Sequence, residues 1–144
     1  MQTTPASEPN AALRSAAIAA LVTLLILDLG MFASMLAGIE PHPPGTRGPY
    51  IAATAALAAA TLWQVIAAQR AAVVLLALTA LSFLPGVGPH KLFTEPAARD
   101  LAPVILVGSG ALFTLLYIAV RLHRLWRSPQ ASMPQTAPAA GPCT

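Results

Sequence analysis

Four long apolar stretches, separated by short polar segments, make up most of the chain. A helix needs roughly 20 mainly apolar residues to cross about 30 Å of hydrocarbon, and each stretch approaches or exceeds that length. The pattern therefore predicts an all-α, polytopic membrane protein, an antiparallel four-transmembrane-helix bundle. The predicted spans are residues 13–38, 50–68, 71–88 and 101–122.

Prolines, glycines and polar pairs separate the stretches. Residues 40–49 hold four prolines and two glycines, and helices end before such segments because proline lacks a backbone donor and restricts the residue before it. Gln69 and Arg70 interrupt an apolar run that would be about 58 Å long as one helix, so we expect a tight turn there. Residues 1–10 and the Pro/Ala-rich residues 128–144 are expected to be disordered tails.

The composition agrees with a membrane protein. Of the 144 residues, 56% are hydrophobic and 9% are charged, whereas a soluble domain carries about 25% charged residues. The net charge is only +3 and the basic residues form no patch, which argues against a nucleic-acid partner. The single cysteine, Cys143, excludes a disulfide framework. Seven arginines against one lysine, with many alanines, are typical of a GC-rich bacterial gene, so we expect a bacterial inner membrane.

The basic residues predict how the chain is threaded. Four spans place both termini on one side, together with the turn at 69–70. Five of the eight basic residues lie on that side, and Arg47, Lys91 and Arg99 lie on the other. Because basic residues near short loops stay cytoplasmic, we expect both termini in the cytoplasm. A cleaved signal peptide is the alternative for the first stretch, but the apolar sequence continues well beyond Asp28.

Aromatic and basic residues at the ends of the stretches are typical of a membrane interface. Arginines there meet lipid phosphates, and amphipathic rings lie at the depth of the headgroups. The lipid bilayer is accordingly the first partner that the sequence predicts. The expected interfacial anchors are Tyr50, Arg121, Arg124, Trp126 and Arg127.

Asp28 is the only ionisable residue deep within a predicted span. An ionised aspartate near the bilayer midplane costs about 2.5–3.5 kcal/mol, so it must face the bundle interior, be protonated or find hydrogen-bond donors. Comparing depths along the stretches places Ala58, Ser82 and Ser109 at its level, with the two serines as candidate donors. Two interpretations stay open, a proton or cation site and a structural hydrogen bond between helices.

Small residues indicate where helices approach closely. Gly30, Ser34 and Gly38 recur every four residues and would form a stripe on one face of the first helix. Gly108 and Gly110 are small residues on the fourth predicted helix, where another helix could also approach closely. Small side chains let a second backbone approach in a membrane. We therefore predict that these residues form helix-packing or oligomer interfaces.

The sequence offers little for catalysis or cofactor binding. Gly108-Ser109-Gly110 is similar to the short signature of intramembrane serine proteases, but His123 lies about 21 Å further along the same helix, out of reach of a nucleophile. His42 and His90 lack metal-ligand spacing, and no histidine lies inside a span to bind haem. We expect no enzyme, no metal site and no cofactor.

Two functional hypotheses follow. The preferred one is a non-catalytic accessory subunit or homo-oligomeric component of a larger membrane complex, with the small-residue stripe as its interface. The alternative is a small proton-coupled transporter that uses Asp28. Four helices with one membrane-embedded acid on the first resemble the layout of the small multidrug resistance exporters. That resemblance implies a proton-exchanging role for Asp28 alone, and the Gly- and Pro-rich loops differ from the compact turns of those exporters.

Overall fold

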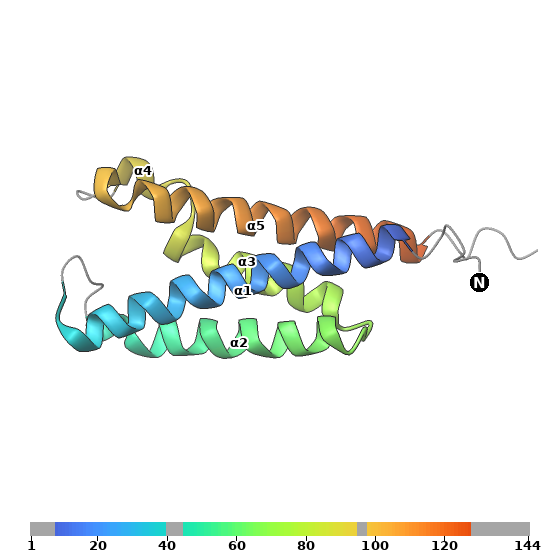
Figure 1. The fold of residues 1–144 in the computed structure, drawn as a ribbon, viewed down its shortest axis with the longest axis horizontal. Coiled ribbons are helices and arrows are strands. Elements are labelled where there is room, and N and C mark those ends of the chain that lie inside the picture. Colours follow the sequence, from blue (N-terminus) through green and yellow to red (C-terminus); the bar gives the residue numbers. More distant parts are fainter. Residues whose placement is uncertain (1–7, 40–44, 95–97, 128–144) are drawn as a thin grey trace, which may run out of the picture.

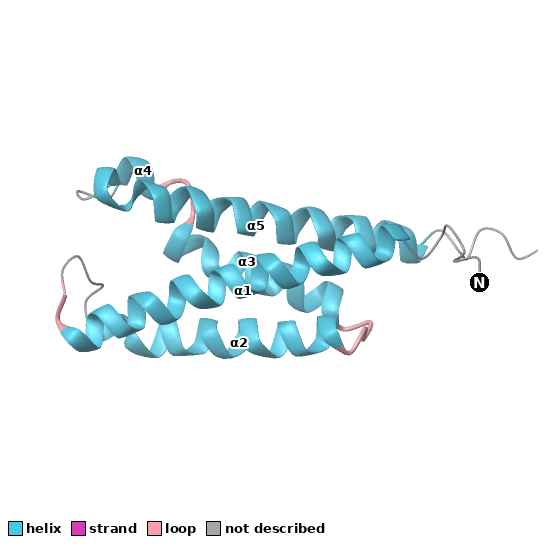
Figure 2. Cartoon of the chain, viewed as in Figure 1, coloured by secondary structure: helices cyan, strands magenta, loops and turns pink. Residues whose placement is uncertain are grey.

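The structure is a computed structural model that describes residues 8–39, 45–94 and 98–127. Within these ranges the chain is helical with no strand, and four long helices form an antiparallel bundle (Figures 1 and 2). This confirms the all-α four-helix bundle that the apolar pattern predicts. The helices are α1 (Glu8–Ala37), α2 (Gly48–Ile66), α3 (Ala72–Val87), the short α4 (Lys91–Thr94) and α5 (Ala98–Arg127), with a 3-10 turn at Gly45–Arg47.

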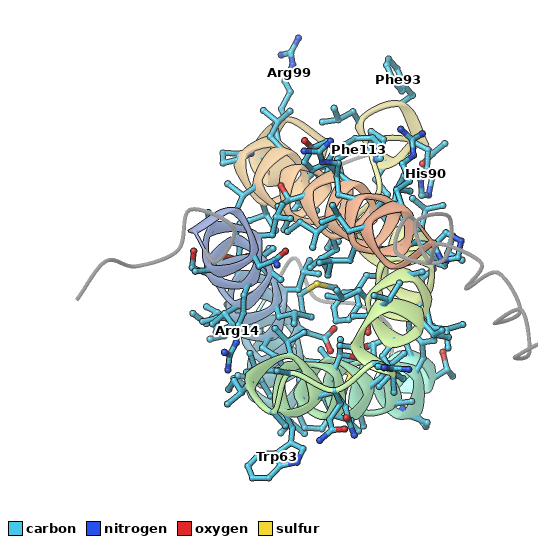
Figure 3. All side chains as sticks on the ribbon, turned by 90° about the vertical axis from the view of Figure 1, so that its right-hand side faces the viewer. Arg14, Trp63, His90, Phe93, Arg99 and Phe113 are labelled. Carbon is cyan, nitrogen blue, oxygen red and sulfur yellow. The ribbon has the colours of Figure 1, made fainter. Side chains whose placement is uncertain are left out.

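The surface of the bundle is apolar, as a protein in lipid requires. Four helices within the described residues are long and apolar enough to cross a membrane. Large apolar side chains face outward: Trp63 is 70% exposed and Ile26 is 65% exposed, and Figure 3 shows Trp63 pointing away from the bundle. Water disfavours a continuous surface of this kind, whereas lipid tails are as apolar as the side chains. These features fit a small multi-pass membrane protein.

The four long helices close into a ring. Helices α1 and α3 each pack against both α2 and α5. Fully buried side chains from α1, α3 and α5 fill the middle of the ring, and they include Leu21, Leu24, Leu76, Leu112 and Leu115. The first and last described residues lie at the same end of the bundle (Figure 1), which we call the tail end; the opposite end, with Gly45–Arg47 and α4, is the loop end.

Local capping explains where α1 and α2 end. Gly38 follows α1 with a φ of 64°, and the N–H of Ile39 donates to the carbonyl of Ser34 at 3.0 Å, the pattern of a glycine C-cap. Ala68 follows α2 in the same left-handed region with a φ of 53°, and the N–H of Gln69 donates to the carbonyl of Gln64 at 3.1 Å. The turn between α2 and α3 therefore uses the same device without a glycine.

The helices differ in length from the predicted stretches. Helix α1 begins at Glu8, inside the segment expected to be a tail. Helix α2 begins at Gly48 rather than Tyr50, because a proline is well tolerated in the first turn of a helix. Helix α5 continues to Arg127, past the predicted end at 122. Most of the predicted tails, 1–7 and 128–144, lies outside the described residues.

Candidate functional site

Asp28 lies inside the bundle on the side of α1 that faces α2. Its side chain is 7% exposed, and the Thr54 hydroxyl donates to Asp28 Oδ2 at 3.0 Å. The carbonyls of Tyr50 and Ile51 lie 3.1 and 2.9 Å from the same hydroxyl, so they compete for its single proton. A protonated carboxyl can donate to that hydroxyl oxygen while the threonine proton turns to a carbonyl. The Thr54 hydroxyl can therefore hydrogen-bond to Asp28 whether the carboxyl is ionised or protonated.

Of the two serines expected to bond Asp28, Ser109 uses its hydroxyl elsewhere. Ser109 is buried, and its hydroxyl donates to the carbonyl of Val87 at 3.0 Å, a carbonyl left without a partner at the end of α3. The backbone carbonyl of Ser82 accepts a hydrogen bond from the Tyr50 hydroxyl. Neither serine bonds to Asp28 within the described part of the chain.

The register between α1 and α2 also differs from the one that the depth comparison predicts. Asp28 pairs with Thr54, and near the loop end the methyl group of Met35 lies 3.2 Å from where a Cβ of Gly48 would be. Ala58, which the depth comparison places opposite Asp28, is thus one helical turn too far along α2. That comparison aligns the centres of the stretches. It takes no account of how each helix is rotated about its axis or shifted along it relative to its neighbours.

The Asp28 carboxyl lines a cavity of about 440 Å³. Asp28 lies nine residues before the end of α1, or about 14 Å along the helix, so the cavity reaches from inside the bundle to the loop end. This volume falls within the roughly 300–1,000 Å³ of small-molecule sites. The cavity is therefore large enough for a small solute.

The cavity walls divide into three parts. Asp28 and Thr54 provide the polar groups at the inner end. Apolar side chains, Phe83 and Ile51 among them, line the middle. The loop end carries the basic side chains Arg47, His90 and Lys91.

A second cavity, of about 380 Å³, lies at the tail end. It is lined by Arg14 and Gln69 together with apolar residues such as Ala17 and Leu76. The guanidinium of Arg14 donates to the carbonyl of Ile66, the last residue of α2, where a cation also meets the negative end of the helix dipole.

A packed layer lies between the two cavities along the helices. On α1, Leu21 and Leu24 lie between the residues that line the two cavities, and both are fully buried. At the same level the hydroxyls of Thr61 and Thr79 lie 2.7 Å apart and are also fully buried. This layer thus combines buried leucines with one threonine pair that joins α2 to α3.

The predicted small-residue positions fall into different environments. Gly30 is exposed, Ser34 is half-buried, and Gly38 lies beyond the end of α1 as its cap. Gly108 is buried, and a Cβ there would lie 2.8 Å from the Cβ of Val87, whereas a Cβ on Gly110 would meet nothing within 4 Å. Of the four predicted glycines, Gly108 alone therefore marks a close contact between helices inside the bundle.

The expected interfacial anchors occupy both ends. Tyr50 lies near the loop end and lines the Asp28 cavity. Arg121 and Arg124 are exposed at the tail end, where the guanidinium of Arg121 lies 6.0 Å from the centre of the Tyr117 ring. The side chains of Trp126 and Arg127 lie outside the described part of the structure.

Sequence reasoning missed three threonines that matter here. Thr54, Thr61 and Thr79 are all buried, and Thr54 and Thr61 are seven residues apart, which places them on one face of α2. That spacing was the available signal.

Acidic and histidine side chains do not gather into a metal-like cluster in the ranges 8–39, 45–94 and 98–127. His42, Glu40 and Glu95 lie outside those ranges. Comparison of the chain with models of known families, with curated proteins and with solved structures gave no match.

Proposed function

We propose that this protein is a small, non-enzymatic membrane carrier that exchanges protons for a solute at Asp28. One observation carries the proposal: a buried carboxyl within a membrane span lines a cavity that is large enough for a small molecule. An intramembrane acid is expensive to retain and is a functional site by default. A purely structural link between α1 and α2 would need no cavity beside it.

The surroundings of Asp28 support proton exchange. Thr54 offers an oxygen that accepts from the protonated carboxyl and a hydroxyl that donates to the ionised one. A carrier must also reach its site from both sides of the membrane. The two cavities at opposite ends, separated by the layer around Thr61 and Thr79, supply the beginnings of such a route.

The proposal includes an orientation. With both termini in the cytoplasm of a bacterial cell, as the distribution of basic residues favours, the tail-end cavity opens inward. The cavity that holds Asp28 then opens to the outside of the cell membrane. Solute would be exchanged for protons across the packed layer between them.

The test is transport by the full chain in proteoliposomes that contain a pH-sensitive dye. Solutes of three classes, organic ammonium ions, zwitterions and carboxylates, are added outside one at a time. We expect one class to move protons above the level of empty liposomes, and treatment with dicyclohexylcarbodiimide, which modifies protonated carboxyls, to stop this movement. Proton movement that persists after complete modification of Asp28 would disprove the proposal.

A second candidate function is a non-catalytic subunit of a homo-oligomer or a larger membrane complex. The observation that favours it is the open surface at Gly30, which is exposed and where an added Cβ would meet no side chain and no other helix within 4 Å. Ser34 continues this surface one turn further along α1. Another helix could approach closely here because small residues permit backbone contact in lipid.

Gly30→Leu separates this candidate from the carrier. If a partner helix packs at Gly30, the leucine side chain will displace it, and the native complex will migrate at the mass of the 14.8 kDa chain in blue-native electrophoresis. The control is Ala59→Leu, at a position on α2 that is also exposed, which should leave migration unchanged. If the complex stays intact in the Gly30→Leu variant, the surface at Gly30 is not its interface.

A further inference from the structure

The ionised form of Asp28 has fewer hydrogen-bond donors around it than it can use. A carboxylate offers about four acceptor positions. Within the described residues, its hydrogen bonding consists of one contact, from the Thr54 hydroxyl at 3.0 Å. That hydroxyl has a single proton, for which the carbonyls of Tyr50 and Ile51 compete. An ionised Asp28 therefore needs further donors and a positive charge beside it.

The basic side chains at the loop end do not supply that charge. Arg47 is exposed, and Thr54 follows it by seven residues, or about 10 Å along α2. The Debye length is about 8 Å at physiological ionic strength, so an exposed charge at that distance acts weakly on Asp28 and on a solute beside it. Lys91 already has an interaction within the chain. A partner for the carboxylate must therefore come from the contents of the cavity.

The walls of the cavity indicate the rest of the solute. Beyond Asp28 and Thr54, the lining includes the apolar side chains of Met31, Ile51 and Phe83. Hydrocarbon that leaves water for such a surface gains free energy. An occupant with a charged donor at one end and a hydrocarbon body is therefore complementary to the cavity.

We propose that the solute is an amphiphilic primary amine, which binds with its ammonium group at Asp28 and its hydrocarbon body against these apolar walls. This inference rests on the proposed function, and it names the substrate class of the same site. The ammonium group has three N–H donors, enough for both carboxylate oxygens and the Thr54 hydroxyl oxygen. A quaternary ammonium ion has the same charge but no donor, so it leaves the carboxylate without these hydrogen bonds.

Exchange of such an amine for a proton at one carboxyl is electrically neutral. When the amine binds, the O–H bond of the protonated Asp28 breaks, the proton leaves to water, and the carboxylate pairs with the ammonium group. When the amine leaves, the carboxylate takes up a proton from water. One ammonium ion therefore moves for one proton, and Asp28 does not remain in the span as an unpaired charge, which would be costly.

Two sources share this chemistry, a free alkylamine and the ethanolamine headgroup of a lipid. Both carry a primary ammonium group next to hydrocarbon or lipid tails. A free amine would reach the cavity from water at the loop end, and the lipid would reach it from the surrounding leaflet. The experiment therefore begins in a lipid that has no N–H donor on its headgroup.

The test is isothermal titration calorimetry of the full chain in phosphatidylcholine nanodiscs with three probes that share a six-carbon chain. They are hexylamine, hexyltrimethylammonium, which keeps the charge without donors, and 1-hexanol, which has no charge. We expect hexylamine to bind about tenfold tighter or more than either analogue, because hydrogen bonds to a charged group are the strong ones. Empty nanodiscs give the background from partition of each probe into lipid.

Variants of the full chain assign this preference to the carboxyl. Asp28→Asn should weaken hexylamine about tenfold or more, to the affinity of 1-hexanol, whereas Asp28→Glu should keep the preference for hexylamine over hexyltrimethylammonium. Asp100→Asn is the matched control, because Asp100 is an exposed acid in the first turn of α5, and it should change no affinity. Phosphatidylethanolamine added to the nanodiscs will compete with hexylamine if the lipid headgroup is an occupant, and will leave the affinity unchanged if the occupant is a free amine.

The outcomes separate this inference from the proposed function. If hexyltrimethylammonium binds as tightly as hexylamine and both are lost in Asp28→Asn, the assignment to primary amines is wrong but a cation site at Asp28 stands. If 1-hexanol binds as tightly as hexylamine, or if no probe binds, the assignment is also wrong. The dye-loaded proteoliposomes then decide the proposed function independently, because a carboxylate or a zwitterion that moves protons there would keep the carrier and exclude the amine.

Discussion

Asp28→Asn is expected to reduce proton-coupled solute movement about 100-fold or more, within the range that a proton-transferring side chain contributes to reactions. The amide has nearly the same shape as the carboxyl and still bonds to the Thr54 hydroxyl, so the packing of α1 against α2 is retained. It cannot take up or release a proton near neutral pH. The measurement is the rate of solute-driven pH change in dye-loaded proteoliposomes.

Two further variants test whether the loss of transport is specific to the carboxyl of Asp28. Asp28→Glu keeps a carboxyl and should retain measurable transport, because the cavity beside Asp28 has room for one more methylene. Asp100→Asn removes an acid from the exposed first turn of α5 and should have no effect. If Asp28→Asn inserts, folds and transports like the unmodified chain, the carboxyl is only a structural link between helices.

Gly108→Leu is expected to destabilise the bundle by about 3 kcal/mol, the upper part of the range for overpacked cores. A Cβ at this position would already lie 2.8 Å from the Cβ of Val87, and leucine adds three more carbons. Helices α3 and α5 must separate, and the bond from Ser109 to the Val87 carbonyl is then lost. Reversible unfolding of the purified protein by SDS in mixed micelles measures the difference.

Gly110→Leu provides the comparison for this substitution. It lies two residues away on the same helix, and its Cβ would meet nothing within 4 Å. Both substitutions raise helix propensity equally, by roughly 1 kcal/mol, so the difference between them isolates the contact with α3. Equal stability of the two variants would show that α5 does not approach α3 closely at Gly108.

The four-helix architecture could be predicted from the sequence because its signal is strong and local. A bilayer allows few structures to span it, and runs of apolar residues of the required length select the helical one. The breaks at Gln69-Arg70 and at the Pro-rich segment determine the number of spans. No information about contacts between helices is needed for that conclusion.

The candidate site depends on contacts between helices, and the sequence alone does not reveal most of these contacts. Asp28 could be identified because an acid is costly in a span, but its partner Thr54 could not, since the stagger of α2 against α1 is set by packing. The sequence gives no reason to treat Gly108 and Gly110 differently. The structure does, because Val87 lies close to Gly108 and not to Gly110. The cavity is formed by α1, α2, α3 and α4 together, and no single stretch predicts it.

The order of synthesis gives the pairing of Asp28 with Thr54 one more consequence. Thr54 emerges from the ribosome 26 residues after Asp28, a delay of roughly 1–5 s at 5–20 residues per second. If the first nascent helix entered the bilayer alone, Asp28 would lie in the bilayer without its hydrogen bond to Thr54 during this delay. Entry of the first two helices together, as a hairpin, avoids this interval.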